Sequence, residues 1–159
     1  MIGVVIHIED CWNYTQSDRD IDILQIYQET AKFLGADLFI IIDKTTEGVF
    51  STSRRPDLEY ATYNSIGEVI NAYPNMAKLY FEHIRTIPLD VKYVSLSDLI
   101  HPKDNVLYVF GGDDQGLNFA EIPLGENDQA VTILVPDAIL WVIVAMTIAF
   151  TDRNTKGTL

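Results

Sequence analysis

Four segments of the chain carry nearly continuous apolar residues, many of them β-branched, at 2–8, 37–43, 105–111 and 129–135. Uninterrupted apolar runs of this length are typical of strands that are buried on both faces of a sheet. A fifth segment, 77–84, fits either a strand or a helix, and the elements around it favour a strand. The pattern therefore predicts five buried strands.

The segments between these strands have a different period. Residues 20–35 carry apolar side chains at helical spacing, with acidic residues at the start and Gly35 at the end, which predicts a helix. A short helix is expected at 65–74, and a helix that is apolar on almost every face at 138–150. Strands that alternate with helices predict an α/β domain with a mostly parallel sheet flanked by helices.

Two segments give weaker patterns. Residues 44–64 are expected to form a loop region with a short strand near 60–63, and 89–100 a brief strand followed by a helical turn. A length of 159 residues is that of one domain, so 1–159 is interpreted as a single unit.

The formal charge changes the expected partners. The chain has 11 basic and 23 acidic residues, a net charge of −12, whereas surfaces that bind nucleic acid are usually basic. The charge argues against tight autonomous RNA binding but leaves open a local patch, for which the candidates are Arg54, Arg55, Lys78, Arg85 and Lys92.

Cysteine content and hydropathy indicate where the protein acts. Cys11 is the single cysteine, so no internal disulfide can form, and an intracellular protein is expected. The first ten residues lack the pattern of a signal peptide, and the apolar run at 138–150 is too short to span a bilayer. We expect a cytoplasmic protein with no membrane partner.

The stretch VLYVFGGDDQGL, residues 106–117, ends a predicted strand in a glycine-bracketed acidic turn. A phosphate-binding P-loop would need Lys followed by Ser or Thr where this loop has Gln115 and Leu117, and its two acids would repel phosphate. Asp113 and Asp114 are adjacent and tend to point apart, and the three histidines have no metal-ligand spacing, so no metal site is expected. Two interpretations remain: a turn of acids at the edge of the sheet, or a loop whose backbone contacts a neutral nucleoside cofactor.

The glycine loop, the following VTILVP and the terminal apolar helix together resemble the last third of SPOUT methyltransferases, and more narrowly the SpoU-like RNA ribose 2′-O-methyltransferases. Phe110, Gly111, Gly116 and Leu117 match the family's loop motif, in which Asp113 replaces a glutamate. The terminal motif is matched by Leu140, Val142, Val144, Ala145 and Ile148, whereas Ile139, Trp141 and Ile143 replace its polar residues.

This resemblance implies a SPOUT-like α/β knot with a C-terminal trefoil knot, a homodimer, and S-adenosylmethionine as cofactor. The expected cofactor pocket is enclosed by 111–117, 134–140 and the stretch near 82–88. The implied cofactor-binding residues are Phe110, Gly111, Gly112, Gly116, Leu117, Ile133, Leu134, Pro136, Leu140 and Ala145.

The first family motif is only partly present. ETAKFLG, residues 29–35, matches it at Thr30, Ala31 and Gly35, but Glu29 stands where the family has its functional arginine. Asp113 or Glu29 is the candidate base for the acceptor, and Arg19, just before the predicted helix, is the candidate replacement for the arginine.

Three hypotheses follow. The first is a divergent S-adenosylmethionine-dependent methyltransferase that acts on RNA, at the ribose 2′-oxygen by resemblance. The second is a catalytically degenerate dimer of the same fold that binds or regulates, and the third is an unrelated α/β domain whose loop match is accidental. A homodimer is expected to form through the helix at 138–150, because Trp141, Ile143 and Met146 exceed what one small domain can cover.

Overall fold

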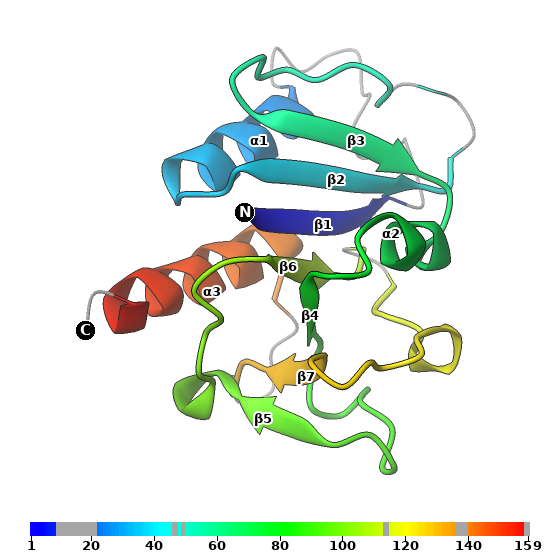
Figure 1. Cartoon of the computed structure of the whole chain (residues 1–159), viewed down its shortest axis with the longest axis vertical. Coiled ribbons are helices and arrows are strands. Elements are labelled where there is room, and N and C mark those ends of the chain that lie inside the picture. Colours follow the sequence, from blue (N-terminus) through cyan, green and yellow to red (C-terminus); the bar gives the residue numbers. More distant parts are fainter. Residues whose placement is uncertain (9–21, 46–47, 49, 113–114, 136–139, 158–159) are drawn as a thin grey trace.

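The computed structural model describes residues 1–8, 22–45, 48, 50–112, 115–135 and 140–157. Its strands form one seven-stranded sheet in the order β3-β2-β1-β6-β4-β7-β5, shown in Figure 1. Every neighbouring pair is parallel, so the predicted parallel α/β sheet is confirmed. The strands are β1 (Ile2–Ile8), β2 (Leu38–Asp43), β3 (Glu59–Tyr63), β4 (Ala77–Phe81), β5 (Tyr93–Ser95), β6 (Val106–Phe110) and β7 (Gln129–Thr132).

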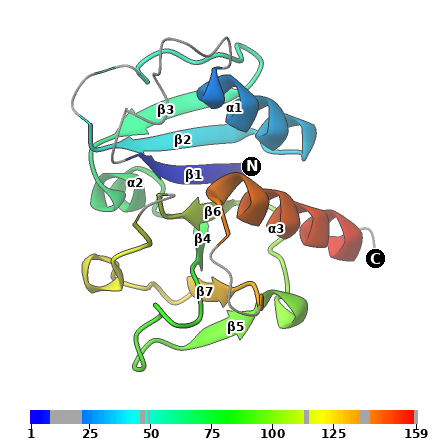
Figure 2. The same ribbon diagram turned by 180° about the vertical axis from the view of Figure 1, so that it is seen from behind.

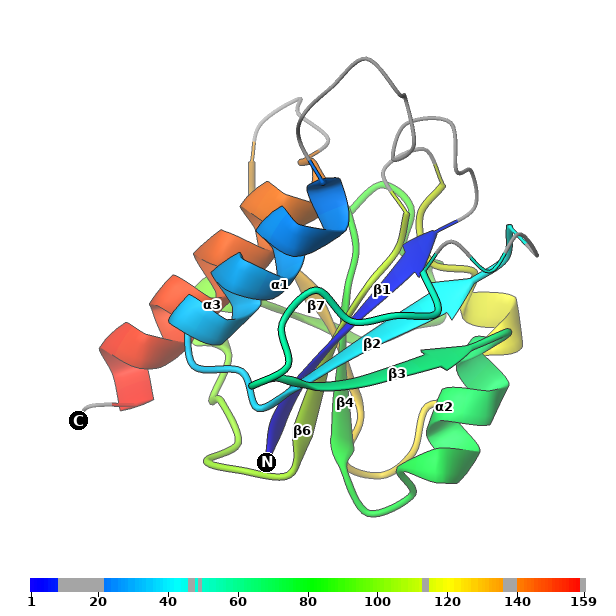
Figure 3. The same cartoon turned by 90° about the horizontal axis from the view of Figure 1, so that it is seen from above.

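In the described residues, three α-helices cover the sheet, with α1 and α3 on one face and α2 on the other (Figure 3). The helix α1 (Ile23–Phe33) begins after Asp22, whose side chain accepts a hydrogen bond from the Gln25 amide, and it is followed by Gly35 at φ +99°. The helix α2 (Ile66–Ala72) begins after Ser65, which accepts from the Glu68 amide in the same way. Side-chain caps of this kind fix where each helix starts.

The central strands are buried on both faces, as their continuous apolar runs predict. One apolar core lies between the sheet and the pair α1 and α3, and includes Tyr108 and Phe150. A second core lies on the α2 face and includes Ile40 and Tyr80. Seen from behind in Figure 2, the helix α3 (Val142–Gly157) crosses the sheet beside α1.

Most of the predicted elements are confirmed, and the terminal helix has different bounds. Residues 77–84 contain the strand β4, and 89–100 contain β5 followed by a 3₁₀ turn at Leu96–Asp98. The expected short strand near 60–63 is β3, a full member of the sheet.

The terminal helix was predicted at 138–150 but starts at Val142 and continues to Gly157. The predicted helix ends where the apolar pattern ends. The observed helix continues because Arg153 and Lys156 donate to backbone carbonyls in the segment between β5 and β6. In the described part of the chain, none of the helices is both long and apolar enough to cross a membrane.

Candidate functional site

A cavity of about 250 Å³ lies at the carboxyl ends of β4, β6 and β7, beside the start of α3. We call it the glycine cavity. The segments predicted to enclose a pocket, at 82–88, 111–117 and 134–140, all contribute to it. It is lined by Phe81, Glu82, His83, Thr86, Phe110, Gly111, Gly112, Gly116, Ile133, Val135, Leu140, Val142 and Ala145.

The two ends of the glycine loop lie against each other. A Cβ atom at Gly111 would come 2.9 Å from the backbone of Gly116, closer than carbon atoms pack. The Gly112 amide donates to the Gln115 carbonyl at 2.8 Å, which closes the turn. Glycine is therefore required at 111 by the close approach of two backbone segments.

Glu82, the residue after β4, ties that strand to the loop. Its Oε1 accepts from the His83 amide at 2.7 Å, and its Oε2 accepts from the Leu117 amide at 2.6 Å. A Cβ at Gly116 would come 2.2 Å from Oε2, so glycine leaves room for the carboxylate. Hydrogen bonds to an ionised acceptor are shorter and stronger than neutral ones. The two hydrogen bonds from the His83 and Leu117 amides hold the Glu82 carboxylate at the cavity wall.

The lining suits a nucleoside with a positive charge. Phe81 and Phe110 stack with ring centroids 4.9 Å apart and, with Ile133 and Leu140, give apolar walls. Glycine backbone borders the cavity, with the Gly112 N–H taken by the Gln115 carbonyl, and Glu82 supplies a single carboxylate. The volume of about 250 Å³ is slightly below the usual range for small-molecule sites, which begins at about 300 Å³. These groups fit the adenosine and sulfonium of S-adenosylmethionine.

The structure brings seven of the ten predicted cofactor-binding residues to this one cavity: Phe110, Gly111, Gly112, Gly116, Ile133, Leu140 and Ala145. Leu117 is buried next to it and contributes its amide to Glu82. Leu134 is not one of the residues that line the glycine cavity, and it is 61% exposed. Pro136, Asp113 and Arg19 lie outside the described residues.

Sequence reasoning located the segment 82–88 and interpreted His83 as a pocket-edge residue, which the lining confirms, but it did not identify Glu82. A carboxylate directly after a buried strand was the available signal, because the carboxyl ends of parallel strands border ligand sites. His83 accepts from the Arg85 amide at Nδ1, and its carbonyl accepts from Thr86, so the segment folds into a tight turn at the cavity edge.

Glu29 is an exposed residue of α1, four residues after Gln25, whose Nε2 donates to Glu29 Oε1 at 2.8 Å. The loop before β3 brings Arg55 near enough for the charge of Glu29 to raise the Arg55 pKa, although the larger cause is the hydrogen bond to Asp57. The neighbouring Arg54 is engaged by Asp22 at 2.6 Å. Both arginines are thus paired with carboxylates.

The local basic patch that the sequence left open loses one of its five candidate residues. Lys78 is buried in β4 and does not belong to a surface patch, because its strand lies in the middle of the sheet. Among the described residues no group of three histidine, cysteine, aspartate or glutamate side chains could hold a metal ion.

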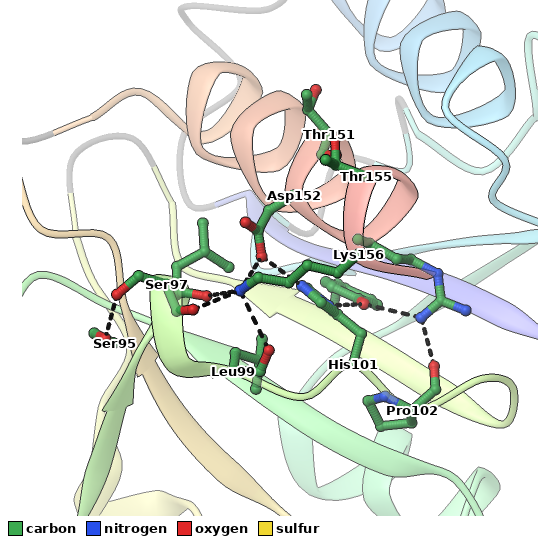
Figure 4. Close-up of polar contacts among 12 residues, drawn as sticks. Ser95, Ser97, Leu99, His101, Pro102, Thr151, Asp152, Thr155 and Lys156 are labelled. Atoms are coloured by element: carbon green, nitrogen blue, oxygen red, sulfur yellow. Dashed lines mark hydrogen bonds and ion pairs between the residues drawn. The ribbon is translucent and has the colours of Figure 1, made fainter. Parts of the chain in front are cut away.

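A second polar cluster lies on the last turns of α3 (Figure 4). His101 Nε2 lies 2.9 Å from Asp152 Oδ2, its Nδ1 lies 2.6 Å from the Tyr108 hydroxyl, and the His101 side chain is 3% exposed. Lys156 reaches the same Asp152 oxygen and the carbonyls of Leu96 and Ser97. The cluster fastens α3 to the loop before β6.

Proton positions in this cluster follow from its donors and acceptors. An ionised Asp152 only accepts, so His101 Nε2–H donates to it, and Nδ1 accepts from the Tyr108 hydroxyl. Burial lowers the pKa of His101 more than Asp152 raises it. Burial also acts to raise the pKa of Asp152, but hydrogen bonds from Lys156 and His101 lower it overall. Burial of His101 therefore favours its neutral form in the folded protein.

No protein-family model and no curated protein matches the sequence, but solved structures of RNA methyltransferases share the fold. A structure described for the 2-OH methylation of C/U34 on tRNA has a TM-score of 0.65 and 15% identity over 99% of this chain and 96% of its own. An rRNA methyltransferase from Sinorhizobium meliloti has a TM-score of 0.63 and 17% identity over 97% of this chain and 56% of its own. The TrmH/SpoU tRNA modifying enzyme of A. aeolicus has a TM-score of 0.61 and 14% identity over 98% of this chain and 77% of its own.

The predicted resemblance to SpoU-type methyltransferases is therefore confirmed at the level of the fold. The chain spans just over half the length of the Sinorhizobium meliloti protein and nearly the whole length of the protein described for tRNA methylation.

Proposed function

We propose that the protein is an S-adenosylmethionine-dependent methyltransferase that acts on RNA, with the glycine cavity as its cofactor site. One observation carries this proposal: in a fold shared with RNA methyltransferases, the glycine loop and the start of α3 enclose a cavity at the carboxyl ends of three parallel strands. Ligands of open parallel sheets bind at such edges.

The chain's own residues would position the cofactor. Backbone groups of Gly111 and Gly112 would take the polar edge of the adenine, and the apolar walls would take its faces. The Glu82 carboxylate, with one lone pair on each oxygen still available beyond its two amide donors, would accept from a ribose hydroxyl or neutralise positive charge. When bound, the cofactor supplies an electrophilic methyl group on sulfur.

Methylation of a ribose hydroxyl releases its proton, so a side chain of this protein would have to accept that proton. Among the residues that the structure describes, Glu29 is the candidate for this base, because its carboxylate is exposed on α1. Asp113, which follows the loop glycines, is the alternative base, and Arg19 is the proposed substitute for the family's arginine.

The remaining features of the proposal come from the same resemblance. The C-terminal segment would form the trefoil knot, and a homodimer would form through the terminal helix together with Trp141, which directly precedes it and is 71% exposed. Met146 is completely buried within its own domain, so it does not contribute to that surface. An RNA-modifying enzyme of this kind would act in the cytoplasm.

Transfer of a radiolabelled methyl group from S-adenosylmethionine to bulk small RNA tests the activity. The proposal expects label in RNA that alkali does not release as ordinary nucleotides, because a 2′-O-methyl group blocks alkaline cleavage. Binding of the cofactor without transfer to any RNA would favour the catalytically degenerate dimer, for which the presence of Glu29 at the arginine's position is the supporting observation.

A further inference from the structure

A second cleft, of about 230 Å³, opens on the other side of the glycine loop. His7 at the end of β1, Lys44 after β2 and Ser65 before α2 line it, together with residues after β6. We call it the polar cleft. Gly116 is the residue that lines both the polar cleft and the glycine cavity, so the loop forms a common wall.

Strand topology accounts for an opening at this place. From β1 the chain continues to β2 on one side, whereas from β6 it continues to β7 on the other side. Neighbouring strands whose connections leave in opposite directions form a crevice beyond their carboxyl ends, which is where open parallel sheets bind ligands. His7 Nδ1 lies 2.8 Å from the Phe110 carbonyl and joins the two strand ends at the base of this crevice.

The polar cleft has a different chemistry from the glycine cavity. Ile66, Leu117 and Ile122 are buried and form an apolar floor. Lys44 contributes a cation to the lining and Glu121 a carboxylate. Asn118 Oδ1 accepts from the Ala120 amide, which leaves the Asn118 NH₂ group as a donor. An apolar floor with a cation and amide donors suits a flat base that carries carbonyl acceptors and a phosphate.

We infer that the polar cleft binds one nucleotide of the RNA substrate, next to the cofactor. The inference rests on the proposed function for the identity of the polymer, and it adds a site that the glycine cavity does not contain. Single-stranded RNA is read by hydrogen bonds to the edges of unstacked bases. A cleft limited to one nucleotide also allows RNA recognition on a chain whose net charge is −12, because it needs a single local cation.

Nucleotide binding is measured by NMR titration of the whole protein with uridine 5′-monophosphate and with adenosine 5′-monophosphate. Each titration is repeated in the presence of S-adenosylhomocysteine, which occupies the cofactor site. Three variants are compared: Lys44→Gln, Asn118→Asp and Gln129→Glu. Asn118→Asp keeps the acceptor for the Ala120 amide but replaces the donors by a negative charge. Gln129→Glu adds the same charge at the amino end of β7, whereas the polar cleft lies at the carboxyl ends of β1 and β6.

Uridine 5′-monophosphate, whose base carries carbonyl acceptors, is expected to bind with S-adenosylhomocysteine present, and Asn118→Asp and Lys44→Gln are each expected to weaken this binding about tenfold. Gln129→Glu should leave the affinity unchanged. Competition between uridine 5′-monophosphate and S-adenosylhomocysteine would place the nucleotide in the glycine cavity and overturn the inference. Equal affinity in all variants, no binding of uridine 5′-monophosphate, or tighter binding of adenosine 5′-monophosphate would also overturn it. The affinity of S-adenosylhomocysteine itself, titrated alone, reports on the proposed function separately.

Discussion

Glu82 and Leu117 join the end of β4 to the loop after β6, with Glu82 Oε2 2.6 Å from the Leu117 amide nitrogen. This hydrogen bond sets the position of the loop and explains the glycine that precedes Leu117, because a side chain at 116 would collide with the same oxygen. The shape of the glycine cavity therefore depends on a carboxylate that the loop motif does not contain.

Replacing Gly116 by alanine should destabilise the protein by about 1–3 kcal/mol, since the new Cβ must displace a carboxylate held by two amides. The matched control is Gly67→Ala in α2, where the nearest atom to the new Cβ is 3.7 Å away. Alanine in a helix should stabilise there by up to about 1 kcal/mol. Urea unfolding measures both, and equal stability of the two variants would contradict the assigned role of Glu82.

Glu82→Gln should cost about 1–3 kcal/mol of stability, because the amide NH₂ cannot accept from a backbone N–H and one of the two amides loses its partner. The same change at the exposed Glu59 of β3 serves as the control. Unfolding of both variants is measured in urea at pH 7. If Glu82→Gln matched Glu59→Gln, the carboxylate would not be holding the loop.

Stability should fall as the pH drops below about 6.5, the ordinary pKa of histidine. Burial lowers the pKa of His101 in the folded state, so the folded protein binds fewer protons there than the unfolded chain. The contribution of His101 to the free energy of unfolding is complete above that pH and is lost progressively below it. Asp152 acts in a lower range, because its folded pKa lies below 3.8.

The thermal midpoint between pH 8 and pH 5 measures this effect. In His101→Gln the side chain keeps one donor for Asp152 and one acceptor for Tyr108 but does not titrate, so the decline between pH 7 and 5 should be smaller than in the wild type. An identical decline in both proteins would assign the pH dependence to other groups.

Arg153→Leu should destabilise the protein by about 2–4 kcal/mol, because the Arg153 guanidinium donates to the carbonyls of Pro102 and Lys103 and to the Tyr108 hydroxyl. Lysine should not rescue this site fully, since a single ammonium cannot reproduce the planar fork. Unfolding is measured by urea titration, and full stability of Arg153→Lys would show that charge alone suffices.

The protein should be a dimer in solution, and Trp141→Glu should convert it to a monomer because a charge would be buried in the contact. Light scattering at micromolar concentration measures the mass. Leu89→Glu is the control, because Leu89 is also an exposed apolar residue but does not adjoin α3, whereas Trp141 directly precedes it. A monomeric wild type, or a monomer produced by Leu89→Glu, would contradict a dimer through the terminal helix.

The sequence was sufficient to predict the buried strands and the segments of the cavity, because both depend on local patterns. Continuous apolar runs located β1, β2 and β6, and glycines at a strand end located the loop. The polar end of α3 was not predicted, since its residues are held by carbonyls of a distant loop.

Long-range contacts explain the other omissions. Glu82 and Leu117 are 35 residues apart, and nothing near Glu82 in the chain indicates that its carboxylate meets the glycine loop. Lys78 was a candidate for a surface patch until the sheet order placed its strand between β6 and β7. Spatial proximity of this kind depends on the order of the strands in the sheet.

The most direct test of the proposed function is calorimetric titration of the protein with S-adenosylmethionine, together with Ala145→Leu, which places a larger side chain in the glycine cavity. We predict saturable binding with one cofactor per chain, weakened about tenfold or more by Ala145→Leu and unchanged by Leu134→Ala, a residue that does not line the cavity. Absence of binding at millimolar cofactor, or equal binding by Ala145→Leu, would contradict the assignment of the glycine cavity as a cofactor site.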